Sequence, residues 1–379
     1  MKAIVIHEPG GPEKLCYEDV PTPVVRAGWS LVRVRGFGIN HSEIFTRKGL
    51  SPGVSFPRIL GIECVGEIAE TTDPLRLPAG QKVISIMGEM GRAFDGGYAE
   101  YALLPNEQIC PVETDLDWKI LAALPETYYT AYGSLLNLRI GDIKTDSETG
   151  CKTRSKTGET GIRTPRILVR GATSGVGVAF LRLLKGRWVE LHVSGSTRSM
   201  KKEAQLREAG FDEVILDADG VLQTDRQFDR VLELIGPATL RDTFSHVVEG
   251  GIVCSTGQLG GQWTLNDFDP IFDLPANGYL TSFYSGNVDP ARLQSLLDYV
   301  RTYGIDPAPE RVFSLPQVPE AHAYLESAHS FGKVIARRFD ESLAIRSERV
   351  LNAKNRQNSA ENFWLFRAKN INIYGKMQT

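Results

Sequence analysis

The sequence lacks the features that mark three other classes of protein. Its five cysteines lie far apart and form no CxxC pair, which argues against a disulfide framework and against a cysteine-rich zinc lobe. No uninterrupted apolar run reaches the roughly 18 residues that a membrane-spanning helix needs. The formal net charge is -3, so there is no excess of positive charge for binding nucleic acid. These absences favour a globular protein whose partners are small molecules and other protein chains.

Histidine is sparse, and the start of the chain has no targeting signal. The six histidines are scattered, and none has a second histidine or an acid at a recognised ligand spacing, so we predict no metal site. Met1–His7 lack the longer apolar stretch and the cleavage site of a signal peptide and instead read as a first strand. We therefore expect a cytoplasmic protein.

The residues that are present divide the chain into two parts of different character. A length of 379 residues suits two domains, and 42% hydrophobic residues can supply a core for each. Up to about Tyr132, short β-patterned runs separated by glycine and proline predict a compact, mostly β domain. These runs are Leu31–Arg35, Val65–Ile68, Lys82–Ile86 and Tyr98–Tyr101.

From Arg166 onward, strand-like runs alternate with amphipathic segments of helical length. This alternation predicts βαβ units and a parallel, doubly wound sheet. A helix over Val176–Lys185 is expected directly after the first strand. The predicted strands are Ile167–Val169, Val189–Val193, Val214–Leu216, Val231–Leu234 and Ile252–Ser255.

A glycine-rich turn follows the first of these strands. A dinucleotide-binding turn must be almost bare of side chains, because the pyrophosphate sits against backbone N–H groups at the positive end of the following helix. Ala172 and Ser174 replace the first two glycines of the strict GxGxxG pattern, so a glycine-rich turn of some other α/β protein is the alternative interpretation. The residues expected to hold the cofactor are Gly171, Ala172, Thr173, Ser174, Gly175, Val176 and Gly177.

The end of the second strand indicates which cofactor binds. About 20 residues past the last glycine, NAD enzymes place an acid that holds the ribose 2′-hydroxyl. Here the chain has Ser196, Thr197 and Arg198, with Lys202 on the next turn, and no carboxylate. Hydroxyls and a guanidinium suit a 2′-phosphate, which predicts NADPH. The alternative is that Arg198 is only a solvated residue at a helix start.

Taken in order, these residues resemble the medium-chain dehydrogenase/reductase superfamily, specifically its zinc-independent quinone oxidoreductase-like branch. The resemblance covers most of Met1–Phe339 and is collinear. Besides the nucleotide turn, the matching motifs are Gly38–Glu43, Leu60–Gly66, Asp95–Glu100, Leu124-Pro125, Thr130–Tyr132, Val231–Gly236, Gly250–Val253 and Gly332–Ile335.

The resemblance implies an α/β fold with two domains. A GroES-like, mostly β catalytic domain is expected at 1–135 and 310–340, and a Rossmann domain with a doubly wound parallel sheet at 136–309. It also implies a homodimer. The polar segment 142–165 is predicted to be a disordered insertion, with a functional lid or a segment absent from the working protein as alternatives. Residues 341–379 are predicted to be a loosely packed polar tail.

The resemblance also bears on the metal. Zinc-dependent alcohol dehydrogenases of the superfamily carry a cysteine where Asn40 stands and a histidine where Ile62 stands, so both ligand positions are lost. Glu63 is retained, but one carboxylate does not hold zinc. We therefore expect hydride transfer that is assisted by hydrogen bonds and positive charge alone.

That chemistry favours the reduction of an activated double bond. Hydride addition to an enone or a quinone puts negative charge on the carbonyl oxygen, so hydrogen-bond donors aimed at this oxygen suffice. In the family, the loop that starts at Asn40 and the segment around Thr130 line the nicotinamide, and we expect both residues to contact it. Glu43 and Arg47 match positions near the cleft, with ordinary salt bridges as the alternative.

The proton donor is less well defined. Related quinone reductases often have tyrosines where this chain has Phe45 and Ser51. Tyr128 is the candidate replacement, with a packing role for Tyr128 or a proton from water as alternatives. We expect NADPH-dependent reduction of a small enone, enoyl or quinone substrate. A zinc-free alcohol or aldehyde reductase and a catalytically silent NADPH-binding protein are the other two hypotheses.

Overall fold

The computed structural model describes residues 1–142 and 165–337, and Met1–Arg337 form one compact unit. Nearly all of the predicted insertion at 142–165 and all of the predicted tail at 341–379 lie outside the described residues. Within the described ranges, no helix is both long enough and apolar enough to cross a membrane.

The first part of the chain folds into two mostly antiparallel sheets. Its strands are β1 (Lys2–Ile6), β2 (Leu15–Asp19), β3 (Trp29–Ile39), β4 (Arg58–Ile59), β5 (Glu63–Thr71), β6 (Lys82–Ile86), β7 (Tyr101–Pro105) and β8 (Cys110–Pro111). The late strands β16 (Arg311–Ser314) and β17 (Val334–Arg337) also belong here, since β17 pairs with β3. The sheets have the orders β2-β1-β4 and β16-β17-β3-β5-β6-β8, and β7 also pairs with β3. The helical segments are η1 (Pro12–Lys14), α1 (His41–Arg47), η2 (Asn106–Gln108), α2 (Trp118–Leu121), η5 (Leu315–Gln317) and α9 (Val318–Glu326).

The second part is built on one seven-stranded sheet. Its strands are β9 (Arg166–Arg170), β10 (His192–Thr197), β11 (Glu213–Ala218), β12 (Val221–Leu222), β13 (Phe228–Glu233), β14 (Val247–Ser255) and β15 (Tyr279–Ser282). They lie in the order β12-β11-β10-β9-β13-β14-β15, and all neighbours are parallel except β12. Counted from β9, this is the 3-2-1-4-5-6 order of a Rossmann sheet. The predicted fold class is confirmed.

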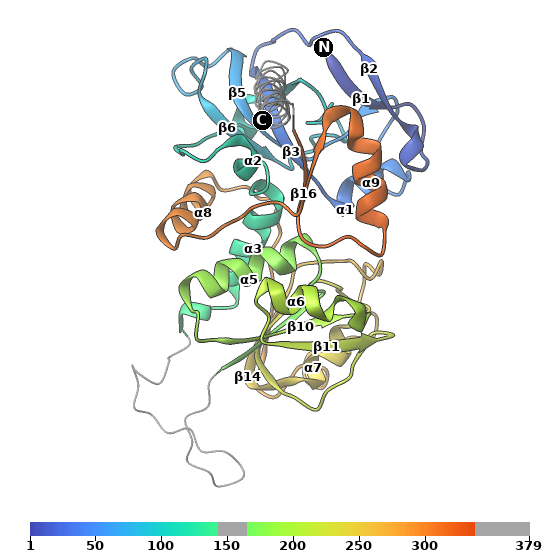
Figure 1. Cartoon of the computed structure of the whole chain (residues 1–379), viewed down its shortest axis with the longest axis vertical. Helices are drawn as coiled ribbons and strands as arrows, with labels where there is room; N and C mark the ends of the chain where they lie inside the picture. Colours follow the sequence, from blue (N-terminus) through green and yellow to red (C-terminus); the bar gives the residue numbers. More distant parts are fainter. Residues whose placement is uncertain (143–164, 338–379) are drawn as a thin grey trace, which may run out of the picture. The chain divides into compact units, whose positions relative to one another are not determined.

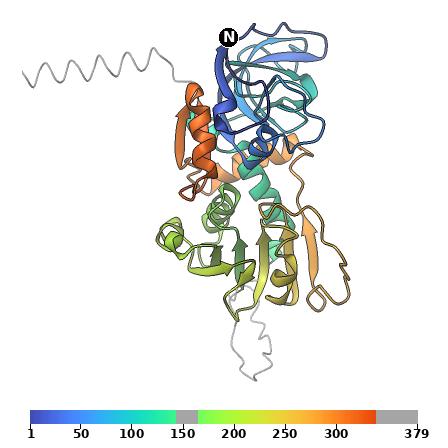
Figure 2. The ribbon, with the colours of Figure 1, turned by 90° about the vertical axis from the view of Figure 1, so that its right-hand side faces the viewer.

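Alternating side chains of this sheet bury two separate cores. Ile167, Val169 and Leu232 join the helices on one face, whereas Leu168 and Val231 pack with α7 on the other. Figure 1 shows α5 and α6 along one side of the sheet and α7 on the opposite side. In Figure 2 the orange strand β15 forms the outer edge of the sheet. The helical segments are α3 (Pro125–Asn137), η3 (Ile140–Asp142), α5 (Gly175–Arg187), η4 (Met200–Lys202), α6 (Glu203–Ala209), α7 (Leu240–Ser245) and α8 (Pro290–Thr302).

Two of the predicted strands are displaced in the structure. The run Tyr98–Tyr101 is extended only from Tyr101, where β7 begins, because Tyr98 and Ala99 bond across to the β1 region outside regular pairing. The predicted strand Val189–Val193 begins at His192, because α5 continues to Arg187 and a turn follows it. The predicted division at 135/136 and 309/310 stays a prediction.

Candidate functional site

The nucleotide turn reverses the chain between β9 and α5. Gly171 has φ +86°, a left-handed conformation that strains residues with a side chain. Ser174 caps the helix: its Oγ accepts a hydrogen bond from the Gly177 N–H at 3.1 Å and donates one to the Gly171 carbonyl at 2.8 Å. The serine at a glycine position of the motif is therefore the N-cap of α5.

The alanine at the other glycine position is also explained by its neighbours. A Cβ built on Gly195 of β10 would lie 2.8 Å from the Ala172 Cβ, so the Ala172 methyl occupies space left by a glycine on the adjacent strand. Gly177 cannot be replaced by a residue with a side chain, since a Cβ there would come 2.8 Å from the Ala172 carbonyl oxygen. The turn thus keeps a bare backbone although it departs from strict GxGxxG.

The carboxyl end of β10 carries the predicted 2′-phosphate residues. Ser196 and Thr197 are buried, and their hydroxyls bond to backbone groups: Ser196 Oγ accepts from Gly171 N at 3.2 Å, and Thr197 Oγ1 donates to Ser199 O at 3.2 Å. Arg198 is exposed and lines a pocket of about 370 Å³ at the ends of β10, β11 and β13. Arg198 therefore faces the pocket, whereas the hydrogen of the Thr197 hydroxyl is already donated to the backbone.

Lys202 lies beside Arg198. Its Nζ donates to the Ser330 carbonyl at 2.6 Å, and partial burial followed by the Arg198 charge lowers the pKa of Lys202. Two cations that repel each other in the free protein make a favourable place for a doubly charged anion.

Two carboxylates that sequence reasoning missed line the same pocket. Asp217 lies in β11, the strand next to β10, and Asp219 directly follows that strand. Asp217 is occupied by the fully buried Arg170, whose Nε and Nη2 donate to its two oxygens at 2.8 and 3.1 Å. Only the sheet order reveals these acids, because in the sequence they lie about 20 residues beyond Arg198.

A buried polar cluster lies around Asn40. The Lys333 Nζ donates to Asn40 Oδ1 and to Glu63 Oε1, both at 2.7 Å, and Asn40 Nδ2 donates to Glu63 Oε1 at 2.9 Å. Glu63 and Lys333 are 0% and 5% exposed. The three side chains come from the start of α1, the start of β5 and the residue before β17, so the fold brings together residues 23 and 293 positions from Asn40.

Glu43 fixes the start of α1 beneath this cluster. Its carboxylate accepts from the backbone N–H of Asn40 at 3.0 Å and of Ile62 at 3.2 Å, in a capping box. Burial, and then the charge of Glu63, raises the pKa of Glu43 to about 7. Arg47 points elsewhere: it is 1% exposed and bonds to Glu326 of α9 at 2.6 Å, which makes it a link between two helices.

The first turn of α3 adds to this cluster an acid that sequence reasoning missed. The Glu126 N–H donates to Glu63 Oε2 at 2.5 Å, and Glu126 Oε1 accepts from Ser285 Oγ at 2.7 Å and from Thr130 Oγ1 at 3.3 Å. Glu126 and Thr130 are one helical turn apart on the same face. Thr130 is therefore joined to the Asn40 cluster through Glu126 and Glu63.

Tyr128, the third predicted catalytic residue, does not join this cluster. Its hydroxyl is buried and accepts a hydrogen bond from Arg182 of α5 at 3.3 Å. The structure thus brings Asn40 and Thr130 together and places the Tyr128 hydroxyl against the opposite helix. Phe45 stands at a position where related reductases often have tyrosine. Its ring packs edge-on against the exposed Trp263, with the two ring centroids 5.7 Å apart.

Residues next to the polar cluster contact the nucleotide turn. The Gly332 N–H donates to the Thr173 carbonyl at 3.1 Å, and Gly332 forms a bridge with Ser174, immediately before Lys333. A Cβ on Gly175 would also meet the Thr127 side chain at 3.4 Å, one residue from Glu126. The Gly332–Lys333 segment therefore links the nucleotide turn to this cluster.

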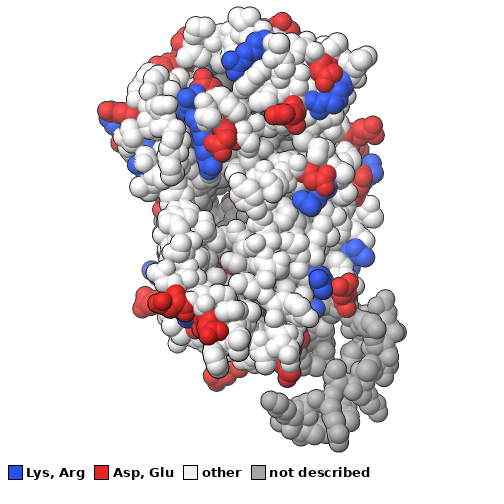
Figure 3. All heavy atoms as spheres, turned by 180° about the vertical axis from the view of Figure 1, so that it is seen from behind, with Lys and Arg blue, Asp and Glu red and all other residues white. Residues whose placement is uncertain are grey.

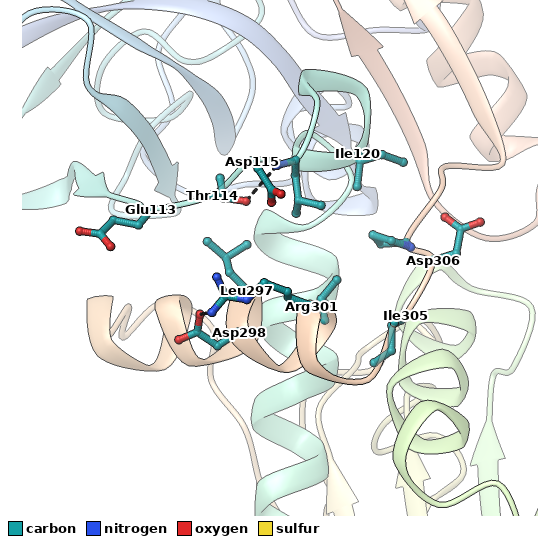
Figure 4. A pocket seen from close by; sticks show the side chains of 13 residues that line it. Glu113, Thr114, Asp115, Ile120, Leu297, Asp298, Arg301, Ile305 and Asp306 are labelled. Carbon is teal, nitrogen blue, oxygen red and sulfur yellow. Dashed lines mark hydrogen bonds and ion pairs between the residues drawn. The ribbon is translucent and has the colours of Figure 1, made fainter.

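Other surfaces of the described residues carry less chemistry. A hollow of about 380 Å³ opens between α2, α8 and residues 304–307, with acidic side chains at its rim (Figure 4). None of its lining residues belongs to the turn or to the Asn40 cluster. The face in Figure 3 mixes positive and negative side chains without a large patch of one sign. Among residues 1–142 and 165–337, no three or more His, Cys, Asp or Glu side chains are grouped to hold a metal ion.

Comparisons with known proteins agree with this geometry. Residues 26–114 match the family model of the alcohol dehydrogenase GroES-like domain, and residues 209–335 match that of the zinc-binding dehydrogenases. The putative quinone oxidoreductase YhfP of Bacillus subtilis is 28% identical over 64% of this chain and 68% of its own. The quinone oxidoreductase of Lama guanicoe is 25% identical over 88% of this chain and 97% of its own.

Solved structures show the same fold. Bacillus subtilis YhfP with NAD bound has a TM-score of 0.72 at 23% identity, covering 89% of this chain and 98% of its own. The YhdH oxidoreductase of Salmonella enterica in complex with NADP has a TM-score of 0.73 at 18% identity, covering 89% and 100%. With both family models and these relatives matched, the chain belongs to the medium-chain dehydrogenase/reductase superfamily and is quinone oxidoreductase-like within it.

Proposed function

We propose that this chain is an NADPH-dependent reductase that transfers hydride to a small conjugated carbonyl, an enone, enoyl or quinone, without a metal ion. The observation that carries the proposal is that Gly332, which contacts the nucleotide turn, directly precedes Lys333 of the Asn40–Glu63–Lys333 cluster. The named relatives are quinone oxidoreductases, which supports the same class of reaction.

The turn fits a dinucleotide. The bare backbone from Gly171 to Gly177 and the N-terminus of the 13-residue helix α5 suit a pyrophosphate. Ala172 and Ser174 do not obstruct it, since one packs on Gly195 and the other caps the helix. Bound there, the cofactor would supply the hydride.

Arg198 and Lys202 favour NADPH over NADH. Arg198 lines the pocket at the end of β10 and Lys202 lies close to it, and a guanidinium binds two phosphate oxygens at once, which supports a 2′-phosphate at this position. Of the two carboxylates that line this pocket, Asp217 already accepts two hydrogen bonds from Arg170 and is poorly suited to hold a ribose hydroxyl.

The cluster supplies donors for the developing negative charge. Lys333 has three N–H bonds and uses two of them on Asn40 and Glu63, so one remains beyond these contacts. The Asn40 amide and the Thr130 hydroxyl hold the cluster together, since they donate to Glu63 and to Glu126. Donors held in a buried site stabilise an enolate oxygen more strongly than water does.

The same ammonium argues against a catalytic zinc. Lys333 Nζ lies 2.7 Å from both Asn40 and Glu63, so a divalent cation bound by these side chains would be repelled at close range. Asn40 and Ile62 moreover offer neither thiolate nor imidazole. We therefore propose metal-free chemistry.

One experiment tests these points together. Absorbance of NADPH, and separately of NADH, would be followed with a panel of enones, enoyl esters, quinones and simple ketones, before and after a chelator. We expect NADPH oxidation with conjugated carbonyls that the chelator leaves unchanged. Loss of turnover with the chelator would overturn the metal-free proposal. Turnover of ketones alone would favour an alcohol or aldehyde reductase, and NADPH binding without any turnover would favour a silent binding protein.

We also propose a homodimer formed through β15. Among the described strands β15 pairs only with β14, and its Tyr279 and Leu280 side chains are exposed. Ile271 and Phe272, in the preceding loop, are 81% and 84% exposed. An unpaired sheet edge beside exposed apolar side chains favours pairing with a second copy of the chain.

A further inference from the structure

The Glu126 carboxyl is only half satisfied in a buried position. Its Oε1 accepts from Ser285 and Thr130, at 2.7 and 3.3 Å, whereas its Oε2 is buried and has no hydrogen-bond partner. An ionised carboxylate with one buried, unpaired oxygen is costly. In the neutral acid the same oxygen can carry the proton, and it becomes a donor that lacks an acceptor.

The carboxyl lies next to both the nucleotide turn and the Asn40 cluster. Its own N–H is bonded to Glu63, the neighbouring Thr127 packs near Gly175 of the nucleotide turn, and Thr130 is one turn further along α3. Glu126 therefore stands between the proposed cofactor turn and the donors of the Asn40 cluster. The acceptor that Oε2 lacks is best supplied by a ligand.

Burial favours the neutral form of the Glu126 carboxyl. Burial, and then the charge of Glu63, raises the pKa of Glu126 to about 7, while the Ser285 hydroxyl, the Lys333 ammonium and the Thr130 hydroxyl act in the opposite direction. Glu63 and Lys333 are the charged side chains that face it. A carboxylic acid with this pKa can give up its proton near neutral pH, whereas an ordinary glutamate is already ionised.

We propose that Glu126 is the catalytic proton donor of the reduction and that its Oε2 donates to the carbonyl oxygen of the substrate. This inference rests on the proposed function. The reduced nicotinamide supplies the hydride and is itself oxidised. As hydride reaches the β-carbon, the π electrons shift to the carbonyl oxygen, the Glu126 O–H bond breaks and the proton passes to that oxygen. The products are an enol and the Glu126 carboxylate, which Ser285 and Thr130 stabilise until water returns a proton.

The first test compares wild-type protein with E126Q and E126D across the pH range around 7. Because the protonated acid is the active form, the wild-type rate should be full below a pKa near 7 and fall as pH rises through it. E126Q should lower kcat by roughly a hundredfold or more and lose this pH dependence. E126D should recover part of the rate with a pH dependence of its own. The matched control is E107Q, the same change at an exposed glutamate on η2, which should behave as wild type.

A second variant keeps the Glu126 carboxyl and raises its pKa. S285A removes a hydroxyl that stabilises the ionised form, so the fall in rate should shift upward by about one pH unit. NADPH affinity, measured by its fluorescence, should stay within about twofold of wild type in both E126Q and S285A. A wild-type rate and pH profile in E126Q, or an unmoved profile in S285A, would overturn the proposal.

A third measurement does not depend on activity. Infrared difference spectra between wild-type and E126Q protein, recorded without cofactor while pH is raised through 7, should show a protonated-carboxyl band that disappears with Glu126. Absence of that band below pH 7 would refute the neutral acid even if the enzyme turns over. A band without any turnover on the substrate panel would instead refute the proposed reductase function.

Discussion

At the scale of single residues, the phosphate end of the cofactor site depends on charge. Thr197 already donates its hydroxyl hydrogen to a backbone carbonyl, and we propose that Arg198 and Lys202 hold the 2′-phosphate. We expect R198A to raise the Kd for NADPH roughly tenfold to a hundredfold, because a charge-assisted hydrogen bond contributes about 1.5–3 kcal/mol. The Kd for NADH should stay nearly unchanged.

Fluorescence titration of both cofactors measures this effect. R207A is the matched control, since Arg207 is an exposed arginine on α6 that pairs with Glu203 within its own helix. Equal weakening of NADPH and NADH by R198A would show that Arg198 serves the fold and does not select the cofactor.

Tyr128 offers a second comparison at this scale. Its hydroxyl bonds to Arg182 between α3 and α5, so Y128F should lower the free energy of unfolding by about 1 kcal/mol and change kcat less than about twofold. Urea denaturation and steady-state kinetics separate the two effects. Collapse of kcat in a normally stable Y128F protein would make the tyrosine the proton donor in place of Glu126.

The sequence predicted only part of the proposed catalytic cluster. Asn40 and Thr130 stand in recognisable motifs, and the structure connects them through Glu63 and Glu126. Glu126, Ser285 and Lys333 were missed because they come from distant segments and their meaning depends on tertiary contacts. A glutamate one turn before Thr130 on the helix was the only local signal for Glu126.

At the scale of elements, the nucleotide turn and β10 fit together through a pair of small residues. A Cβ on Gly195 would lie 2.8 Å from both the Ala172 Cβ and the Phe211 ring, so G195A should lower the free energy of unfolding by roughly 1–3 kcal/mol. Adding A172G should restore part of that loss, since the clash with Phe211 remains.

A double-mutant cycle by chemical denaturation measures the coupling between the two positions. Strict additivity of G195A and A172G would mean that the two residues do not compete for the same space. The cycle therefore tests the explanation for the alanine in the glycine-rich turn.

Periodicity predicted most strands but not all of their limits. The apolar runs in β9, β11, β13 and β14 lie within the observed strands or within one residue of them, because strands buried on both faces need continuous apolar sequence. Tyr98 misled the prediction: its ring is buried and stacks on Phe37, yet its backbone lies outside the regular ladder. Strand β15 was missed, since it is short and mostly exposed.

At the scale of the whole molecule, the two edges of the seven-stranded sheet differ. β15 forms one edge and β12 the other, and each presents an exposed apolar residue, Leu280 and Val221. We expect L280D to convert a dimer into a monomer, because a buried, unpaired carboxylate opposes association. V221D, on the opposite edge, should leave the dimer intact.

Light scattering after size exclusion, over a range of protein concentrations, measures the oligomeric state. A wild-type monomer would overturn the proposed dimer. A dimer that survives L280D would place the interface elsewhere.

The hydrogen bond between the nucleotide turn and the segment before Lys333 limits how domains can be exchanged between this protein and its relatives. Thr173 binds Gly332, and Lys202 binds the Ser330 carbonyl. Residues that contact the proposed cofactor site therefore lie beyond 309, where the nucleotide domain was predicted to end. A chimera in which residues 136–309 come from a relative would contain the relative's nucleotide turn. It would keep this chain's own residues 330–333, which did not evolve with that turn. Exchanging residues 330–333 as well would transfer the turn together with the residues that contact it.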